Sequence, residues 1–227
     1  MRWLFYKITC WIPRLVLTPF VKVKVMHRER ANVEGACILA SNHISHFDPP
    51  CISGYIGPKI DWMAMAELFE SRILGTWLKF AGTFPVERDK PDRKAVKTAL
   101  TRLKMGRMLG LFPEGGIRDG DTSILGGAAM KPGLGMLAQL SAASVLPCVI
   151  LGSDHLYAKR AWRKIRGTTV YVAFGELLRC NGDGKDARTD LENRLAESLR
   201  KLSRDLVTEF DLPADFLPRK AEERLNA

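Results

Sequence analysis

Residues 36–48 read ACILASNHISHFD, an apolar run followed by polar and ionisable side chains. The first six residues form a short apolar run of the kind that builds a buried strand. His43 follows the run after Asn42, and Asp48 stands five positions later, before two prolines. Helical neighbours lie three or four residues apart, so a spacing of five brings the two side chains together only across a turn. We therefore predict a buried strand at residues 36–41, followed by a turn that pairs His43 with Asp48.

The chemistry of this pair is that of a general base and its orienting group. Asp48 would accept a hydrogen bond from one ring nitrogen of His43, and the other nitrogen would take a proton from a substrate hydroxyl. Another interpretation remains open. Asp48 before Pro49 also suits a helix N-cap, which would leave His43 as an ordinary core histidine.

Outside this stretch, short apolar runs alternate with helical patterns. The predicted strands cover residues 36–41, 60–65, 82–86, 108–112, 144–151 and 168–174, and the predicted helices cover residues 49–56, 67–80, 92–105, 131–142 and 188–210. This alternation predicts an α/β fold, a single-domain sandwich with a mostly parallel mixed sheet flanked by helices. Ligands of such sheets bind outside the carboxyl ends of the strands, so we expect motifs that follow strands to share one rim.

The N-terminal residues 1–30 carry seven Lys or Arg against Glu29 alone, with aromatic and aliphatic residues between them. This pattern is typical of an amphipathic helical segment that lies in a bilayer interface beside anionic headgroups. A helix packed on the protein's own core is the alternative. The uncharged runs are too short for a transmembrane span of about 20 residues. We expect a membrane-associating segment at 1–30, the main domain at 31–211 and a charged tail at 212–227.

Composition narrows the partners and the compartment. The net charge of +10 favours an anionic partner, but no nucleic-acid-binding motif is present and the basic residues mix with large apolar ones, so we expect no nucleic acid. The five cysteines are scattered, without a C-x-x-C pair, which argues against a disulfide framework and a zinc site. These features indicate a peripheral protein on the cytoplasmic face of a membrane.

A second motif, GLFPEGGIRDG, covers residues 110–120. Gly115 and its neighbour allow the backbone to approach a ligand and to present amides to an anion. Glu114 cannot itself bind phosphate, so it either orients a basic residue or contacts a substrate hydroxyl. A glycine-rich turn with a solvated Arg118 is the alternative.

Two further stretches are basic. Arg88 ends the sequence GTFPVER at residues 82–88, and a guanidinium can bind phosphate oxygens in bidentate fashion, although an arginine after a strand is often a simple surface residue. Residues 156–166 hold five basic residues and no acidic one, with Tyr157 and Trp162 among them. This run is predicted to contact lipid headgroups, an acidic carrier protein or the phosphates of CoA, or else to be a solvated loop.

Together these blocks resemble the glycerolipid acyltransferase family, the group that contains 1-acyl-glycerol-3-phosphate acyltransferases. The family patterns N-H-x4-D, G-x-x-F-x-x-R and F-P-E-G are matched, in the family's order, by Asn42, His43 and Asp48, by Gly82, Phe84 and Arg88, and by Phe112, Pro113, Glu114 and Gly115. A fourth apolar block surrounds Pro147, so the resemblance spans residues 36–153. It departs from F-P-E-G-T-R-S after Gly115, because Gly116 and Ile117 precede Arg118.

The resemblance implies an acyltransferase of phospholipid biosynthesis. The donor would be an acyl thioester, acyl-CoA or an acylated carrier protein, as co-substrate, and the acceptor a lysophospholipid such as 1-acyl-glycerol-3-phosphate, giving phosphatidic acid. His43 and Asp48 would be catalytic, and the acceptor phosphate would dock on Arg88 with Lys131 and Arg118 assisting. No metal and no other cofactor is expected. An enzyme acting on another lysolipid, a thioesterase and a non-catalytic lipid-binding protein of the same fold are the alternatives.

Overall fold

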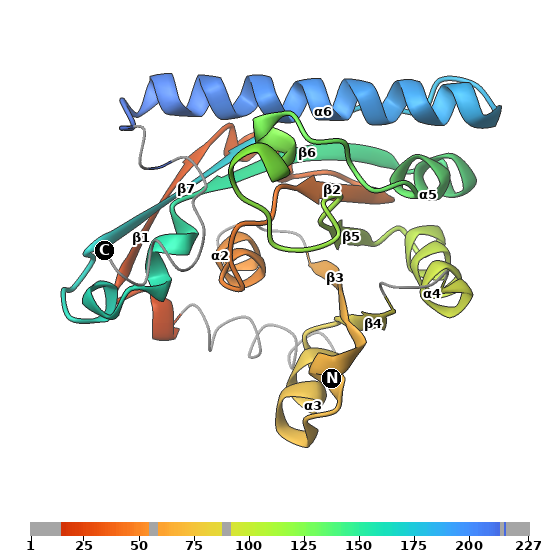
Figure 1. Ribbon diagram of the computed structural model, residues 1–227. Coiled ribbons are helices and arrows are strands. Elements are labelled where there is room, and N and C mark those ends of the chain that lie inside the picture. The colour runs from red at the N-terminus through yellow and green to blue at the C-terminus, as the bar shows by residue number, and fades with distance from the viewer. Residues whose placement is uncertain (1–14, 55–58, 88–91, 214–215, 217–227) are drawn as a thin grey trace.

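The computed structural model describes residues 15–54, 59–87, 92–213 and 216 (Figure 1). Within these ranges the chain forms a seven-stranded sheet with the strand order β1-β7-β6-β2-β5-β3-β4. The strands are β1 (Val21–Met26), β2 (Cys37–Ser41), β3 (Ile60–Met65), β4 (Phe84–Val86), β5 (Met108–Leu111), β6 (Ser144–Leu151) and β7 (Thr168–Phe174). Only the β6–β7 pair is antiparallel among these strands. The prediction of a mostly parallel mixed sheet is confirmed.

Helices cover both faces of the sheet. They are α2 (Asp48–Ser53), α3 (Arg72–Phe80), α4 (Arg93–Lys104), α5 (Leu134–Ser141) and α6 (Gly184–Glu209), with short 3-10 helices η1 (Arg28–Ala31), η2 (Ala66–Phe69), η3 (Gly120–Thr122), η4 (Ile124–Gly126), η5 (Ser153–Tyr157) and η6 (Lys159–Trp162). The side chains of α4, α5 and α6 share one hydrophobic cluster with one face of the sheet. Those of α2, η5 and η6 share a second cluster with the other face, as Figure 1 shows for α6 above the sheet and α2 below it.

Strand β2 lies at the centre and explains why the apolar run at residues 37–41 is unbroken. Its five residues are all buried, with Ile38 and Ala40 in one cluster and Cys37 and Leu39 in the other. A parallel strand covered on both faces needs apolar side chains in both directions. The sequence alternation that marks a half-exposed strand is therefore absent here.

The second half of the expected N-terminal helical segment was predicted wrongly. Val21–Met26 is strand β1, which pairs in parallel with β7 at the edge of the sheet. Its sequence VKVKVM alternates, with Val21 buried, Lys22 exposed and the Lys24 ammonium 4.9 Å from the centroid of the Phe210 ring. The packed domain therefore includes residues before the predicted boundary at 31. Residues 1–14 lie outside the described ranges.

Two other expectations change in detail. The helix predicted at residues 67–80 is divided into η2 and α3, because the side chain of Ser71 accepts a hydrogen bond from the Leu74 amide and starts a new helix. The predicted tail begins too early, because Leu212 is buried and the Phe216 ring lies 5.4 Å from that of Tyr171. Of the helices in the described ranges, none is long and apolar enough to cross a membrane.

The topology brings three loops to one rim. Strand β2 lies between β5 and β6 and runs parallel to both, so the segments after residues 41, 111 and 151 leave the sheet side by side. The first carries His43, the second carries Glu114, and the third carries Ser153. The expectation that motifs after strands share one rim is confirmed.

Candidate active site

His43 and Asp48 meet across the predicted turn. The His43 Nδ1 atom lies 2.7 Å from Asp48 Oδ2, and the same oxygen accepts hydrogen bonds from the amides of Ile44 at 2.8 Å and Ser45 at 3.0 Å. Asp48 is fully buried, whereas His43 keeps 7% of its surface exposed. The N-cap interpretation of Asp48 is wrong, because Phe47 is the N-cap of α2 and the carboxylate of Asp48 points back into the turn.

A serine far along the chain completes the surroundings of Asp48. Ser153 donates its hydroxyl hydrogen to Asp48 Oδ1, and this serine is also fully buried. Asp48 Oδ2 already accepts hydrogen bonds from two main-chain amides, so as an acceptor it favours the His43 tautomer with the proton on Nδ1 and with Nε2 left as an acceptor. A histidine held in this tautomer can take a proton from a hydroxyl that approaches Nε2.

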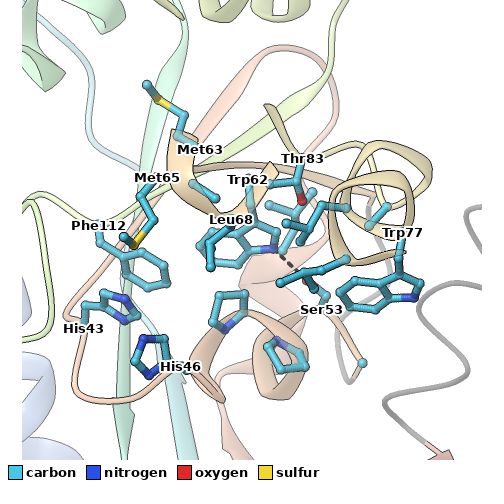
Figure 2. Close-up of a pocket in the computed structure, with 18 of the residues that line it drawn as sticks. His43, His46, Ser53, Trp62, Met63, Met65, Leu68, Trp77, Thr83 and Phe112 are labelled. Carbon is cyan, nitrogen blue, oxygen red and sulfur yellow. Dashed lines mark hydrogen bonds between the residues drawn. The ribbon is translucent and has the colours of Figure 1, made fainter. Parts of the chain in front are cut away.

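Aromatic rings fix the orientation of the His43 ring. The Phe112 ring stacks on it at 3.9 Å between centroids with an interplanar angle of 11°, and the Trp62 ring stacks on Phe112 at 4.9 Å. The Trp62 indole in turn donates a hydrogen bond to Ser53 Oγ at 2.8 Å, drawn as a dashed line in Figure 2. His43 is therefore held at its edge by Asp48 and at its face by a stack that begins on β3.

Glu114 holds the main chain of the same turn. Its Oε2 atom accepts a hydrogen bond from the His43 amide at 2.6 Å, and Oε1 accepts from the Ser123 hydroxyl and the Ile124 amide, each at 2.8 Å. Burial raises the pKa of this carboxyl above its ordinary value, and the three hydrogen bonds offset only part of that rise. The observed contacts give Glu114 a positioning role toward His43, while the expected contact with a substrate hydroxyl stays a prediction.

Of the other predicted binding residues, three lie in the loop beside His43 and one lies outside the described residues. The Arg118 amide donates to the His43 carbonyl at 2.8 Å, and the Lys131 amide donates to the Pro113 carbonyl at 2.7 Å, so both exposed cations belong to the loop beside His43. Gly115 has φ +69°, and a Cβ there would lie 3.0 Å from Lys131 Cγ, so this position favours glycine. Arg88 lies outside the described residues.

An apolar pocket opens beside the histidine, and the sequence did not predict it. Its volume is about 540 Å³, and it lies between β3, η2, α2 and α3, with His43 and His46 at one side (Figure 2). Most of its lining is apolar, including Trp62, Met63, Met65, Leu68, Leu74 and Trp77. Such a pocket can hold a hydrocarbon chain next to the reactive nitrogen of His43.

His46 lines this pocket without competing for Asp48. Its Nδ1 lies 2.6 Å from the Tyr157 hydroxyl oxygen, which also accepts a hydrogen bond from the His46 amide at 3.0 Å. Because a main-chain amide only donates, the tyrosine hydroxyl hydrogen is available for Nδ1. His43 is therefore paired with Asp48 and His46 with Tyr157. The pairing of His43 with Asp48 that the spacing predicted is confirmed.

Comparison with known proteins decides the family. The family model for acyltransferases matches residues 22–151, more than half of the chain. The chain belongs to this acyltransferase family. The matched region contains the turn with His43 and Asp48, the loop with Glu114 and the whole lining of the apolar pocket.

Two sequence relatives and one solved structure are themselves acyltransferases. A 1-acyl-sn-glycerol-3-phosphate acyltransferase of Bacillus subtilis (strain 168) is 27% identical over 172 residues, which cover 74% of this chain and 83% of that protein. A protein of the same name from Streptococcus pneumoniae is 32% identical over 117 residues, 51% of this chain and 41% of that protein. The fold resembles the crystal structure of PlsC, the 1-acyl-sn-glycerophosphate acyltransferase of Thermotoga maritima, with a TM-score of 0.69 at 23% identity, over 88% of this chain and 79% of that one.

Proposed function

We propose that this acyltransferase moves a fatty acyl group from an acyl thioester, acyl-CoA or acylated carrier protein, to the free hydroxyl of 1-acyl-glycerol-3-phosphate, giving phosphatidic acid. The observation that carries the proposal is the His43 ring, held by Asp48 at Nδ1 and lying at the side of an apolar pocket. The names of the two bacterial relatives support this acceptor.

The proposed reaction is direct transfer with His43 as the base. Its Nε2 removes the proton from the acceptor hydroxyl as the oxygen attacks the thioester carbonyl, and Asp48 stabilises the resulting imidazolium. The new C–O bond forms a tetrahedral intermediate, which collapses as the C–S bond breaks. The imidazolium then returns its proton to the leaving thiolate. General-base catalysis of this kind contributes roughly 10²–10⁴-fold to the rate.

Binding energy for this step would come from two sources. The apolar pocket would bury an acyl chain, worth about 0.8 kcal/mol for each methylene removed from water. The acceptor phosphate would bind the cations of the loop beside His43, Lys131 and Arg118, together with Arg88. Holding both reactants in the correct orientation makes the bimolecular transfer effectively unimolecular. Main-chain amides of the loop at Gly115 and Gly116 would stabilise the oxyanion of the intermediate.

The proposed site of action is the cytoplasmic face of the membrane, with the acyltransferase bound peripherally. Exposed apolar side chains on α3 support this location, because Ile73 is 87% exposed while Leu74 of the same helix lines the pocket. An acyl chain can pass from the bilayer to the pocket along such a helix without crossing water.

A labelled acyl thioester, supplied on CoA or on carrier protein and incubated with a panel of lysophospholipids, tests the function. We expect label in phosphatidic acid, with 1-acyl-glycerol-3-phosphate as the best acceptor. Release of free fatty acid without acylated lipid would make the protein a thioesterase. Lipid binding without turnover would make it a non-catalytic binder, and preference for another lysolipid would change the acceptor.

A further inference from the structure

A loop near the rim carries a dense positive charge that the proposed reaction does not use. We call residues 159–166 the basic loop; its exposed cations are Lys159, Arg160, Arg163, Lys164 and Arg166, and it has no acidic residue. One apolar side chain stands among them, because Ile165 is 77% exposed. A single exposed isoleucine is ordinary on a protein surface, so its meaning depends on whether other apolar side chains lie on the same surface.

The start of the described chain lies against this loop and adds to the same surface. The Arg166 amide donates to the Pro19 carbonyl at 2.8 Å, and the Phe20 and Trp162 rings lie 5.4 Å apart. Figure 1 shows the two segments side by side, the first in red and the loop in teal. Leu15 and Val16, four residues or fewer before Pro19, are 65% and 53% exposed. The exposed apolar side chains of Leu15 and Val16 thus lie on the same side of the molecule as the cations of the basic loop.

Aromatic contacts fix this surface to the turn that carries His43. The Phe47 ring lies 5.7 Å from the ring of Tyr157 and 5.7 Å from that of Trp162. The Trp162 indole donates to the Leu156 carbonyl at 2.8 Å, and Tyr157 bonds His46. Phe47 directly precedes Asp48, so the surface is one packed residue away from the candidate active site.

We propose that this surface, the basic loop with Leu15 and Val16, docks the acyltransferase onto an anionic phospholipid bilayer. The cations would lie at the level of the lipid phosphates, and Ile165, Leu15 and Val16 would enter the interface below them. An acidic carrier protein or the phosphates of CoA would use the charge but would leave the aliphatic side chains in water. The inference deepens the proposed function and rests on it in one respect, that the acceptor is a lipid held in a bilayer.

Docking would also explain why the surface lies where it does. A lipid acceptor leaves the bilayer only as far as its headgroup, so the His43 ring must come close to the interface. The packing of Phe47 against Tyr157 and Trp162 sets that distance.

Cosedimentation of the full chain with lipid vesicles tests the proposal without any turnover. The vesicles are phosphatidylcholine alone or phosphatidylcholine mixed with phosphatidylglycerol. The double variant R163E/K164E is compared with K97E/K104E, which reverses two exposed cations of α4 on the opposite side of the molecule. Each cation near an anionic surface contributes about fivefold to partition, so loss of two cations alone weakens binding about 25-fold, and the two added carboxylates weaken it further; we expect R163E/K164E to bind the mixed vesicles at least about 25-fold more weakly and K97E/K104E to bind like the unaltered chain.

The apolar part is tested by Ile165→Asp, with Met105→Asp as its control, because Met105 is 67% exposed at the end of α4. We expect only the first to lower vesicle binding, and circular dichroism should show all four variants folded.

Equal vesicle binding by R163E/K164E and K97E/K104E would overturn the proposal. So would a raised donor KM for R163E/K164E in a vesicle-free assay with a short-chain acceptor, since the loop would then bind the donor. Inactivity of the unaltered chain would refute the proposed function and leave the binding result standing.

Discussion

At the scale of single residues, the Asp48 carboxylate receives four hydrogen bonds, from the His43 ring, two main-chain amides and the Ser153 hydroxyl. An amide in its place can still accept from the His43 ring, but it is neutral and no longer stabilises the imidazolium that forms when His43 takes a proton. We expect Asp48→Asn to lower kcat by roughly 10²–10⁴-fold, the full contribution of a general base, and His43→Ala to lower it at least as much. Initial rates at saturating donor and acceptor measure this.

Ser153→Ala is the matched control, because it removes one of the four donors and leaves the tautomer in place. A hydrogen bond to a carboxylate contributes about 1.5–3 kcal/mol, so a decrease in kcat of at most roughly 10–150-fold is expected, at or below the lower end of the range for Asp48→Asn. Near-normal turnover by purified, folded His43→Ala protein would contradict the proposed base.

The buried cysteines permit a second prediction at this scale. Burial raises the pKa of the Cys37 thiol and of the Cys148 thiol to about 12, so both stay protonated at neutral pH and are poor nucleophiles. We expect neither to react with iodoacetamide in the native protein and both to react once it is unfolded, as peptide mass spectrometry would show. The partly exposed Cys180 is the internal control. Loss of activity through labelling of Cys148 would instead favour an acyl-cysteine intermediate.

Sequence reasoning found the residues whose partners are local. His43 and Asp48 are five positions apart, so the spacing and the prolines were enough to pair them. Ser153 reaches the same carboxylate from 105 positions away and has no signal of its own in the sequence. Glu114 was selected correctly as part of the rim, but its contact with the His43 amide depends on how β2 and β5 pair, which the sequence alone does not specify.

At the scale of elements, the site depends on how closely β3 and β5 approach each other. Gly110 of β5 lies opposite Trp62 of β3, and a Cβ at Gly110 would lie 2.6 Å from Trp62 Cε3 and 2.6 Å from Ile60 Cγ2. Gly110→Ala should therefore displace the Trp62 ring and the Phe112 ring stacked on it. We expect a loss of about 1–3 kcal/mol in the free energy of unfolding, as in other overpacked cores, together with a lower kcat. Urea unfolding and steady-state kinetics measure the two effects.

A second substitution checks that the cause is this contact. Trp62→Phe removes Cε3, one of the ring carbons that the new methyl group would meet, but leaves the contact with Ile60 Cγ2 and also removes the hydrogen bond to Ser53. The double variant should therefore be more stable than the sum of the two single changes predicts. Strict additivity would mean that the Trp62 ring is not what limits the space at Gly110, and would leave the contact with Ile60 as the cause.

The elements themselves were predicted where their apolar patterns were strong. Strands β2, β3, β5 and β6 fall within a residue or two of the predicted ranges, because buried strands need continuous apolar runs. Strand β1 was missed, since Lys22 and Lys24 together with the aromatic residues before them suggested an interfacial helix. The alternating sequence VKVKVM was the available signal, and it fits an edge strand with one exposed face. The apolar pocket has no sequence signal, because four separate elements line it.

At the scale of the whole molecule, strand β1 changes how the N-terminal segment must be tested. Removal of residues 1–25 would delete most of β1 and expose the edge of β7, which invites aggregation whatever the segment does. A chain that begins at residue 15 keeps β1 together with Leu15, Val16 and the basic loop. We expect this chain to fold, with a cooperative urea unfolding transition, and to turn over dispersed short-chain substrates normally.

Vesicle binding distinguishes residues 1–14 from the surface formed by the basic loop, Leu15 and Val16. Residues 1–14 carry Arg2, Lys7 and Arg14 among large apolar residues, so they are expected to contribute to binding of their own accord. The shortened chain should bind mixed phosphatidylcholine and phosphatidylglycerol vesicles more weakly than the full chain, because three cations and several apolar side chains are gone. Adding R163E/K164E to it should weaken binding further, by about the same factor as in the full chain, if the two contacts are independent. Undiminished binding by the shortened chain would assign the anchoring to the surface formed by the basic loop, Leu15 and Val16, and would remove residues 1–14 from the account of membrane attachment.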